Sequence, residues 1–378
     1  MELTLETMNM WKKDPVVMPL YHETKILFAR TEGPSQTVVD NYESLTGESP
    51  ATLIDPNPKK DFAGIFRDGY WSGVSKCTWN PTAGWGEAEE ALRSVIQAAA
   101  DSGEQYVVAD VNKIIFTDGQ ACSGVDAKYG RVVRSEHTVL CTGARTAQLL
   151  ADNSPDVPEL QVNGRMVAAA AAMGLFEVPE DQMFKFESAH IPIHSMGDIP
   201  AETIPPGPKR LCKCTHELSF TNNIYHETSK QTISVPPEPL GQSIWSQDLP
   251  KVSNTKSKKS AKNLQDVLGS CQTTISRNSS RKTKVPIRDA VTPNQDWIIC
   301  PHPASCKLYI AAGGSFHGWK FLVNVGKYVT QMLDGKLDET EARRWAWDRL
   351  DDGGACAMYL PSRDLKDIDG YTGMSQSV

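Results

Sequence analysis

The chain is most distinctive at residues 313–321, which read Gly313-Gly314-Ser315-Phe316-His317-Gly318-Trp319-Lys320-Phe321. An apolar run at 308–312 precedes this stretch, and helical periodicity follows it. Two glycines after a strand let the backbone approach a flat or charged ligand, because neither residue has a Cβ. N–H groups at the start of the next helix favour electron-rich atoms. Spacing alone supports a ligand-binding loop and an ordinary glycine turn equally well.

Five other segments are collinear with the motifs of one enzyme family. Together with residues 313–321 they resemble the sarcosine oxidase-like FAD amine oxidases, in particular the fungal fructosyl-amino-acid (amadoriase) and saccharopine oxidases. The resemblance covers most of residues 1–250 and 289–360. It implies an α/β fold with an α+β substrate layer, the two-layer flavoprotein fold of D-amino-acid oxidase. The segments are Ala83-Gly84-Trp85-Gly86-Glu87-Ala88, Leu140-Cys141-Thr142-Gly143-Ala144, Lys213-Cys214-Thr215-His216-Glu217-Leu218, Asp289-Ala290-Val291-Thr292-Pro293 and Arg344-Trp345-Ala346-Trp347-Asp348-Arg349.

Composition places the chain among ordinary globular proteins, with 40% hydrophobic and 22% charged residues. Its net charge of -7 gives no global case for nucleic-acid binding. No apolar run reaches the roughly 20 residues that span a bilayer. The nine cysteines lack partners at zinc spacing, so no metal site is expected. Without a signal peptide or a C-terminal Ser-Lys-Leu, we expect a reduced, cytoplasmic protein, and we expect a monomer.

The pattern of elements suggests a discontinuous organisation. Helical periodicity at 87–100, a β-rich run at 105–111 and strands within 132–141 suit an α/β layer, whereas 178–233 is mostly β. We therefore expect an incomplete FAD-binding domain from residues 86–150 and 296–350, and a substrate domain from 1–85 and 151–250. A C-terminal tail covers 351–378.

Residues 251–288 form a basic segment with a single acid, Asp266, and little apolar periodicity. Such a segment buries too little apolar surface to offset its ordering entropy, which favours a disordered loop. A polyanion-binding patch is the alternative, although no aromatic residues interleave with the charges. A third interpretation is that a local frame shift or a splicing error replaced ordinary family sequence here.

Lys213 and Glu217 are the first candidates for catalysis. A lone lysine in the short apolar run 210–214 is either on an edge strand or functional, since buried lysines are rare. The resemblance implies that Lys213 lies over the flavin and activates O₂. It also implies that Glu217 contacts the substrate and that Lys320 binds the substrate carboxylate. A lysine in the first turn of a helix opposes the helix dipole, which also favours a function for Lys320.

The resemblance also implies the residues that contact FAD. Val111 matches the position at which backbone groups of the family contact the adenine edge. At Val111 and at 142–144, the alternative is an ordinary connection between a strand and a turn. The expected contacts are Val111, Thr142, Gly143, Ala144, Gly313, Gly314, Ser315, Phe316, His317, Gly318, Trp319 and Lys320.

Two departures from the family concern the cofactor. No Gly-x-Gly-x-x-Gly occurs in the 378 residues, and residues 1–11 match family sequence that follows that unit. We therefore expect an FAD domain truncated at its N-terminus. The family usually carries a cysteine where Ile287 stands, so FAD is expected to be bound non-covalently if it is bound.

The function implied is FAD-dependent oxidation of the secondary amine of an N-substituted amino acid. The substrate would be of fructosyl amino acid, saccharopine, sarcosine or pipecolate type, and O₂ would yield an imine and H₂O₂. A catalytically inactive remnant with weak or no FAD binding is the alternative. A basic-loop interaction protein is the third hypothesis.

Overall fold

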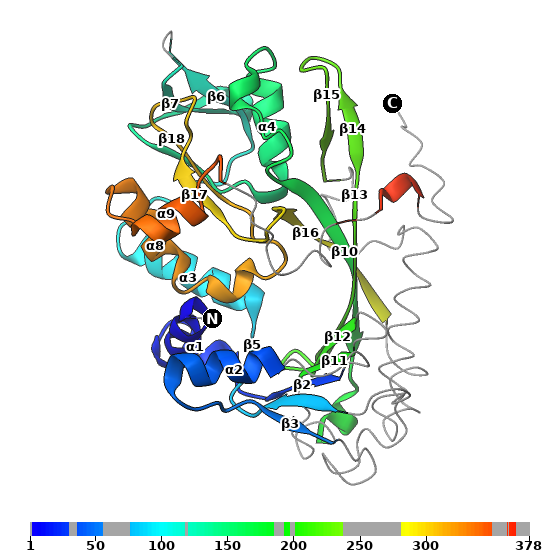
Figure 1. The fold of residues 1–378 in the computed structure, drawn as a ribbon. Coiled ribbons are helices and arrows are strands. Elements are labelled where there is room, and N and C mark those ends of the chain that lie inside the picture. Colours follow the sequence, from blue (N-terminus) through cyan, green and yellow to red (C-terminus); the bar gives the residue numbers. More distant parts are fainter. Residues whose placement is uncertain are drawn as a thin grey trace.

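The structure is a computed structural model that describes residues 2–29, 36–55, 76–117, 120–184, 193–196, 201–236, 281–349, 361 and 363–367. Within this part of the chain, a long curved sheet lies beside a smaller α/β portion (Figure 1). Helices gather on the side of β10 that faces the smaller portion. No described helix is both long and apolar enough to cross a bilayer.

The large sheet has the described strand order β16-β10-β13-β12-β11-β2-β4-β3. Neighbours are antiparallel except β11 and β2, which are parallel. The strands are β2 (Ile26–Ala29), β3 (Thr52–Ile54), β4 (Cys77–Asn80), β10 (Val167–Glu177), β11 (Ile193–Met196), β12 (Ala201–Ile204), β13 (Leu211–Thr221) and β16 (Arg281–Val291).

The smaller portion contains a sheet of order β17-β18-β9 and a meander of order β6-β7-β8. In the first, β9 and β18 are parallel, and β17 is antiparallel to β18. The strands are β6 (Val111–Phe116), β7 (Cys122–Ala127), β8 (Arg131–Arg134), β9 (Thr138–Leu140), β17 (Ile298–Pro301) and β18 (Leu308–Ala312). Two antiparallel pairs complete the described strands. They are β1 (Tyr21–His22) with β5 (Trp85–Gly86), which are distant in the sequence, and the hairpin of β14 (Asn223–His226) with β15 (Gln231–Ser234).

The helices agree in place with the apolar periodicity of the sequence. In α3, Glu89 and Glu90 lie in the first turn, where negative charge complements the helix dipole. Asp338 caps α9 by accepting a hydrogen bond from the Thr340 amide. The α-helices are α1 (Glu2–Lys13), α2 (Gln36–Thr46), α3 (Ala88–Asp101), α4 (Thr146–Asn153), α8 (Val325–Leu333) and α9 (Glu339–Arg344). The 3₁₀ turns are η1 (Met18–Leu20), η3 (Lys128–Gly130), η4 (Gly143–Arg145), η5 (Pro158–Leu160), η6 (Glu180–Gln182), η8 (Gly318–Phe321) and η10 (Leu365–Asp367).

Strand β10 carries the alanine-rich stretch 168–172, although alanine is the strongest helix former. Its backbone is bonded on one side to β13 and on the other to β16. The alanines at 168–171 are all buried, so small side chains let other elements approach the strand closely. Tertiary packing thus outweighs local propensity at this position.

The main apolar core joins α4 to the β17-β18-β9 sheet. Leu150, Leu308 and Ile310 have no exposed surface, and Leu160 and Ile298 are 1% exposed. A second cluster packs α8 and Trp345, which follows α9, against the other face of that sheet at Trp297 and Ile299. Strand β18, whose end carries the loop 313–320, is therefore packed on both faces.

The structure differs from the sequence expectations in two segments. Residues 104–110 have no regular secondary structure, and β6 begins only at Val111. No described strand pairs with that run, which leaves Tyr106 67% and Val108 84% exposed. Residues 281–288, expected to belong to a disordered segment, form most of β16 because β10 offers them a partner. Residues 251–280 lie outside the described residues.

Candidate functional site

Two parallel strands end at the same edge of the smaller sheet. Their register pairs Leu308 with Thr138 and Ile310 with Leu140, so both chains run in the same direction. The segment 141–144 follows β9, and the loop 313–320 follows β18. Ligands of α/β proteins bind beyond the carboxyl ends of such strands. The fold thus brings two of the predicted motifs to one edge.

The loop 313–320 is fixed to the end of β16. The Ser315 amide donates to the Ala290 carbonyl oxygen at 3.0 Å, and the Phe316 amide donates to Asp289 Oδ2 at 2.8 Å. In return, the Thr292 amide donates to Ser315 Oγ at 3.2 Å. A third predicted motif, 289–293, therefore meets the loop directly.

Three loop residues adopt left-handed backbone angles. Gly313 has φ +86°, Ser315 +51° and Phe316 +65°. Glycine adopts this region freely, whereas other residues persist there only when their surroundings hold them. The hydrogen bonds from β16 provide that restraint, and such strain is concentrated at functional sites.

The two glycines also meet a packing requirement. A Cβ on Gly313 would lie 2.8 Å from the Thr292 methyl group, and one on Gly314 would lie 2.8 Å from Asp289 Oδ2. The close packing of the loop on Asp289 and Thr292 therefore leaves no room for a Cβ at either position. By contrast, Gly143 (φ +49°) has no atom within 4 Å of its ideal Cβ, which leaves its backbone open to a flat ligand.

The end of the loop forms η8 and is anchored from two sides. Trp11 Nε1 donates to the Lys320 carbonyl oxygen at 2.7 Å. The Phe321 ring is buried edge-on against Trp297, with 4.8 Å between ring centroids. The backbone of Lys320 is therefore held in place while its side chain is exposed.

A cavity of about 430 Å³ opens beside this anchor. His317 and Lys320 line it together with the aromatic rings of Trp297 and Phe321. Arg344 holds one wall through two hydrogen bonds to Asp296, of 2.7 and 2.6 Å. Charged and polar side chains form most of the wall, and the aromatic rings supply much of its apolar part. A cavity of this volume with fixed charges suits a small polar ligand. The remaining lining residues are Glu2, Leu3, Thr4, Leu45, Gln295, Glu341 and Trp345.

His317 is held in its neutral form at pH 7. Burial and the nearby Lys320 ammonium together lower the pKa of its imidazole to about 4, although the Asp296 carboxylate opposes them. At neutral pH the ring therefore offers one hydrogen-bond donor and one acceptor and carries no charge.

Lys213 lies on β13, half-buried, in the row that contains Leu175 of β10 and Ile204 of β12. Its neighbour Cys212 is fully buried, so Lys213 faces the opposite side of the sheet. Leu175 is six residues along β10 from Ala169, the partner of Asp289. At about 3.3 Å per residue, this row is roughly 20 Å from the Asp289 row.

Glu217 lies in a β-bulge. The register of β10 with β13 jumps from Ala171–Ser219 to Ala172–His216, which leaves residues 217 and 218 without direct partners. The register with β16 also shifts between Ala171 and Met173. Bulges re-aim side chains and are common beside active sites. The side chain of Glu217 itself is outside the described set.

Ile287 pairs with Ala171, at the row where these bulges begin. Across β16, β10 and β13, with strands about 4.8 Å apart, the backbones of Ile287 and Ser219 are separated by about 10 Å. The register thus brings Ile287 near the strand segment that carries Glu217.

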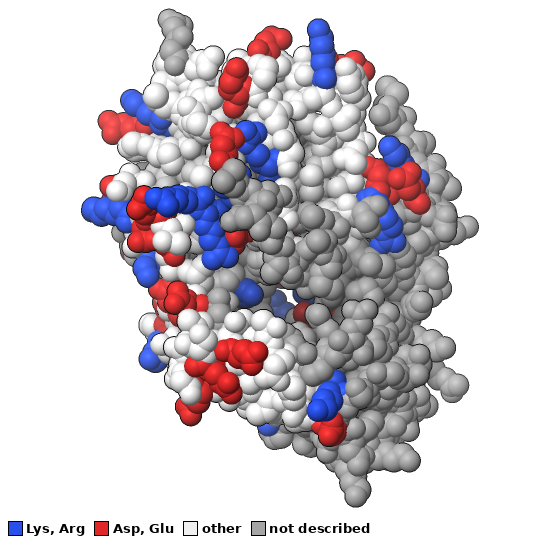
Figure 2. Space-filling model, viewed as in Figure 1, with Lys and Arg blue, Asp and Glu red and all other residues white. Residues whose placement is uncertain are grey.

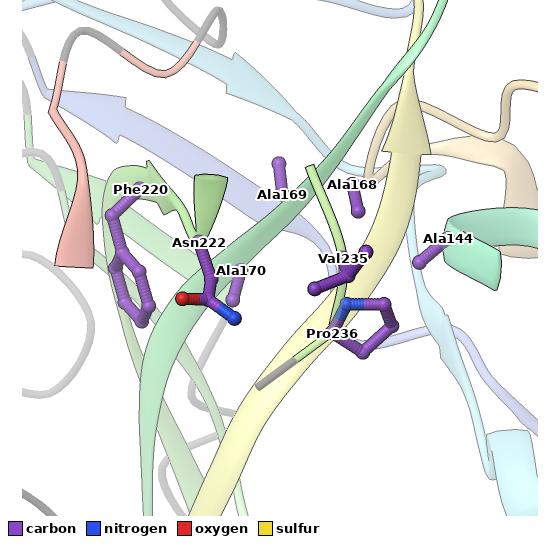
Figure 3. Close-up of a pocket in the computed structure, with 8 residues that line it drawn as sticks. All are labelled: Ala144, Ala168, Ala169, Ala170, Phe220, Asn222, Val235 and Pro236. Atoms are coloured by element: carbon purple, nitrogen blue, oxygen red, sulfur yellow. The ribbon is translucent and has the colours of Figure 1, made fainter. Parts of the chain in front are cut away.

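The turn 142–144 packs on the alanines of β10. Figure 3 shows Ala144 beside a small cavity with Ala168, Ala169, Ala170 and Val235. Its volume of about 10 Å³ leaves room for little more than one water molecule. Ala144 therefore contributes to packing, and Gly143 beside it has the open backbone.

Among the predicted FAD contacts, Val111 lies in a different sheet from the strands that lead into 142–144 and 313–320. It pairs with Ala127 in the β6-β7-β8 meander and is 39% exposed. The described residues give it no contact with 313–320.

Sequence reasoning missed the residues that hold the loop: Asp289, Thr292, Trp11 and Trp297. The motif 289–293 was visible, but its role depends on a contact with residues more than twenty positions away. In the described residues no group of His, Cys, Asp and Glu side chains is arranged to bind a metal ion.

Comparison with known proteins connects this arrangement to a family. The family model "FAD dependent oxidoreductase" (DAO) matches residues 2–332. L-saccharopine oxidase of Schizosaccharomyces pombe is 23% identical over an alignment 381 positions long. The alignment covers 97% of this chain and 84% of the relative. The chain therefore belongs to the DAO family of FAD-dependent oxidoreductases.

Solved structures show the same fold. Fructosyl peptide oxidase from E. terrenum has a TM-score of 0.78 at 19% identity, covering 99% of this chain and 84% of that one. A modified fructosyl peptide oxidase from Aspergillus nidulans, with 7 additional mutations and in complex with FSA, has a TM-score of 0.79 at 22% identity, with 98% and 84% coverage. Both the recognised family and the D-amino-acid-oxidase-type fold are thereby confirmed.

Proposed function

We propose that this DAO-family oxidoreductase oxidises the secondary amine of an N-substituted amino acid with O₂. The products would be an imine, which water hydrolyses, and H₂O₂. The observation that carries the proposal is the loop 313–320, which is locked onto β16 and presents His317 and Lys320 to a cavity of about 430 Å³. The names of the relatives, L-saccharopine oxidase and fructosyl peptide oxidase, support this substrate class.

FAD would supply the redox chemistry by accepting a hydride from the substrate Cα and passing two electrons to O₂. The open backbone at Gly143 and the strained loop fit a flat ring system at the carboxyl ends of β9 and β18. Residues 142–144 and 313–320 would contact it, within a cofactor portion built from 86–150 and 296–350. Because Ile287 replaces the family's cysteine, we propose that FAD is held without a covalent bond.

The substrate would be held by charge. Lys320 is exposed at the cavity wall and would pair with the substrate carboxylate. Glu217, at its bulge in β13, would contact the polar substituent on the amine. The neutral His317 would donate or accept one hydrogen bond. Lys213, half-buried on the sheet, would place a positive charge where O₂ is reduced.

The test is a substrate panel with detection of H₂O₂. Saccharopine, a fructosyl amino acid, sarcosine and pipecolate are each incubated with the FAD-supplemented protein in air, and H₂O₂ is measured with a peroxidase. We expect one of the four to give H₂O₂ and the Lys320→Ala variant to need far more of it. No H₂O₂ from any of them, although FAD is bound, would refute the proposed substrate class.

A second candidate is a member of the family that lacks catalysis and binds FAD weakly or not at all. Two sequence observations favour it: these 378 residues contain no Gly-x-Gly-x-x-Gly, and Ile287 cannot form the family's covalent bond. Titration with FAD distinguishes the two candidates. A Kd for FAD above about 1 mM would support the second candidate and contradict the first.

A further inference from the structure

We propose that Asp289 is a positioning residue of the site, whose carboxylate sets the conformation in which loop 313–320 presents His317 and Lys320 to the cavity. This role rests on the proposed function, because the loop contributes to catalysis only if it contacts cofactor or substrate. The hydrogen bonds that support it belong to the protein alone and are measurable without FAD.

Asp289 connects the two elements that form the site. It lies near the end of β16, paired with Ala169 of β10. Its Oδ2 accepts from the Phe316 amide at 2.8 Å, and its Oδ1 accepts from the Ala290 amide at 2.8 Å. One oxygen thus holds the loop and the other holds the strand. A carboxylate serves both amides because it has two acceptor oxygens, whereas an asparagine amide has one.

The loop needs such a restraint at this point. Ser315 and Phe316 are consecutive non-glycine residues with left-handed angles, a combination that L-residues rarely adopt. The Phe316 amide bonded to Asp289 belongs to the second of them. Directly afterwards, the His317 and Gly318 amides both donate to the Gly314 carbonyl oxygen, at 3.0 and 2.6 Å. The turn that directs His317 therefore begins at the contact with Asp289.

Gly314 matches the carboxylate in shape. An added Cβ would lie 2.8 and 3.1 Å from the two carboxylate oxygens, both closer than ordinary contact. A residue larger than glycine at 314 would push Asp289 away from the Phe316 amide. Gly314 and Asp289 consequently act as one unit, and their substitutions should not be additive.

The first experiment measures hydrogen–deuterium exchange of peptide 313–321 in the FAD-free protein. We expect Asp289→Ala to accelerate exchange of the loop amides at least tenfold, and Asp289→Asn, with its single acceptor oxygen, to lie between this variant and the wild type. Asp364→Ala is the matched control. It removes another buried carboxylate whose two oxygens each accept from a backbone amide, those of Asn223 and Lys366, so it destabilises the protein away from loop 313–320.

The second experiment measures the Kd for FAD by flavin fluorescence in the same variants. A positioning role predicts at least a tenfold rise in Kd for Asp289→Ala and none for Asp364→Ala at equal loss of thermal stability. Gly314→Ala should raise Kd in the wild type but have little further effect on Asp289→Ala, whereas Gly326→Ala, which has open space around its Cβ, should leave Kd unchanged.

The outcomes separate this role from the proposed function. Faster exchange in Asp289→Ala while no variant binds FAD would support the positioning role and refute the proposed function. FAD binding by the wild type with unchanged loop exchange in Asp289→Ala and Asp289→Asn would overturn the positioning role. Equal effects of Asp289→Ala and Asp364→Ala on both readouts would also overturn it, because loss of stability alone would then explain them.

Discussion

The hydroxyl of Ser315 offers a direct test of how the loop is held. Ser315 is 1% exposed, and its Oγ accepts from the Thr292 amide while donating to the Gly313 carbonyl oxygen at 3.2 Å. Ser315→Ala leaves the buried Thr292 amide without this acceptor, which costs about 1–3 kcal/mol of unfolding free energy. We therefore expect Ser315→Ala to be destabilised by roughly that amount.

At this position we expect a glycine variant to be at least as stable as the alanine variant, which reverses the usual order. Ser315→Gly loses the same hydrogen bond but relieves a left-handed residue of about 1–2 kcal/mol of Cβ strain. Glycine also raises the conformational entropy of the unfolded chain, which destabilises the folded variant by about 0.5–1 kcal/mol. Ser315→Gly should thus be as stable as Ser315→Ala or more stable, by up to about 1.5 kcal/mol, whereas glycine is the less stable residue in regular strands and helices.

The assay is urea unfolding followed by tryptophan fluorescence, with Ser135→Ala as control. Ser135 is exposed and its hydroxyl contacts only Thr138 Oγ1 among the described residues, so this control should change stability by less than about 0.5 kcal/mol. A Ser315→Ala protein as stable as wild type would refute the role of the hydroxyl. A glycine variant clearly less stable than the alanine variant would refute the left-handed strain.

Three further predictions concern chemistry and pH. Lys213→Met should slow O₂ consumption by the reduced enzyme more than anaerobic reduction by substrate, and stopped-flow measurements showing equal effects on both would remove Lys213 from O₂ activation. Lys320→Ala should raise KM at least tenfold for carboxylate substrates with a smaller effect on kcat, and an unchanged KM would remove Lys320 from the site. Because burial holds the pKa of His317 near 4, below its unfolded value of 6.5, the unfolded chain takes up a proton first and stability falls as pH drops from about 6.5 to 4. His317→Gln should flatten that fall in urea midpoints measured between pH 7 and 5, and an identical pH dependence would contradict the burial of the imidazole.

Much of the fold was predictable because the signals were local and periodic. The helices at 2–13, 36–46 and 88–101 follow apolar spacing, and the strand 308–312 follows an uninterrupted apolar run. The loop that follows this strand was identified from its amino-acid sequence. The packing requirement for its glycines was not predictable, because the atoms that leave no room for a Cβ belong to Asp289 and Thr292, more than twenty residues away in the sequence.

The remaining features depend on pairing that a single segment does not contain. The alanines of β10 favour helix by propensity and become a strand only between β13 and β16. Conversely, residues 105–110 are rich in strand formers but have no described partner and form no strand. The bulge that contains Glu217 likewise follows from the register of three strands. In these three segments, the available strand partners determine the structure, and local propensity does not.

Charge is of both signs on the face shown in Figure 2, with Lys and Arg interspersed among Asp and Glu. Exposed pairs such as Arg93–Glu89 and Lys336–Asp334 neutralise one another locally. This distribution offers no broad cationic surface on the part of that face that is described, in keeping with the net charge of -7.

The most direct test of the account is the visible absorption spectrum of the purified protein supplemented with FAD and freed of excess, recorded before and after acid precipitation. We predict flavin absorption bands that move into the supernatant, as expected for FAD held without a bond at Ile287. Colour retained in the pellet would contradict the non-covalent site, and a protein that stays colourless with added FAD would contradict the proposed cofactor binding itself.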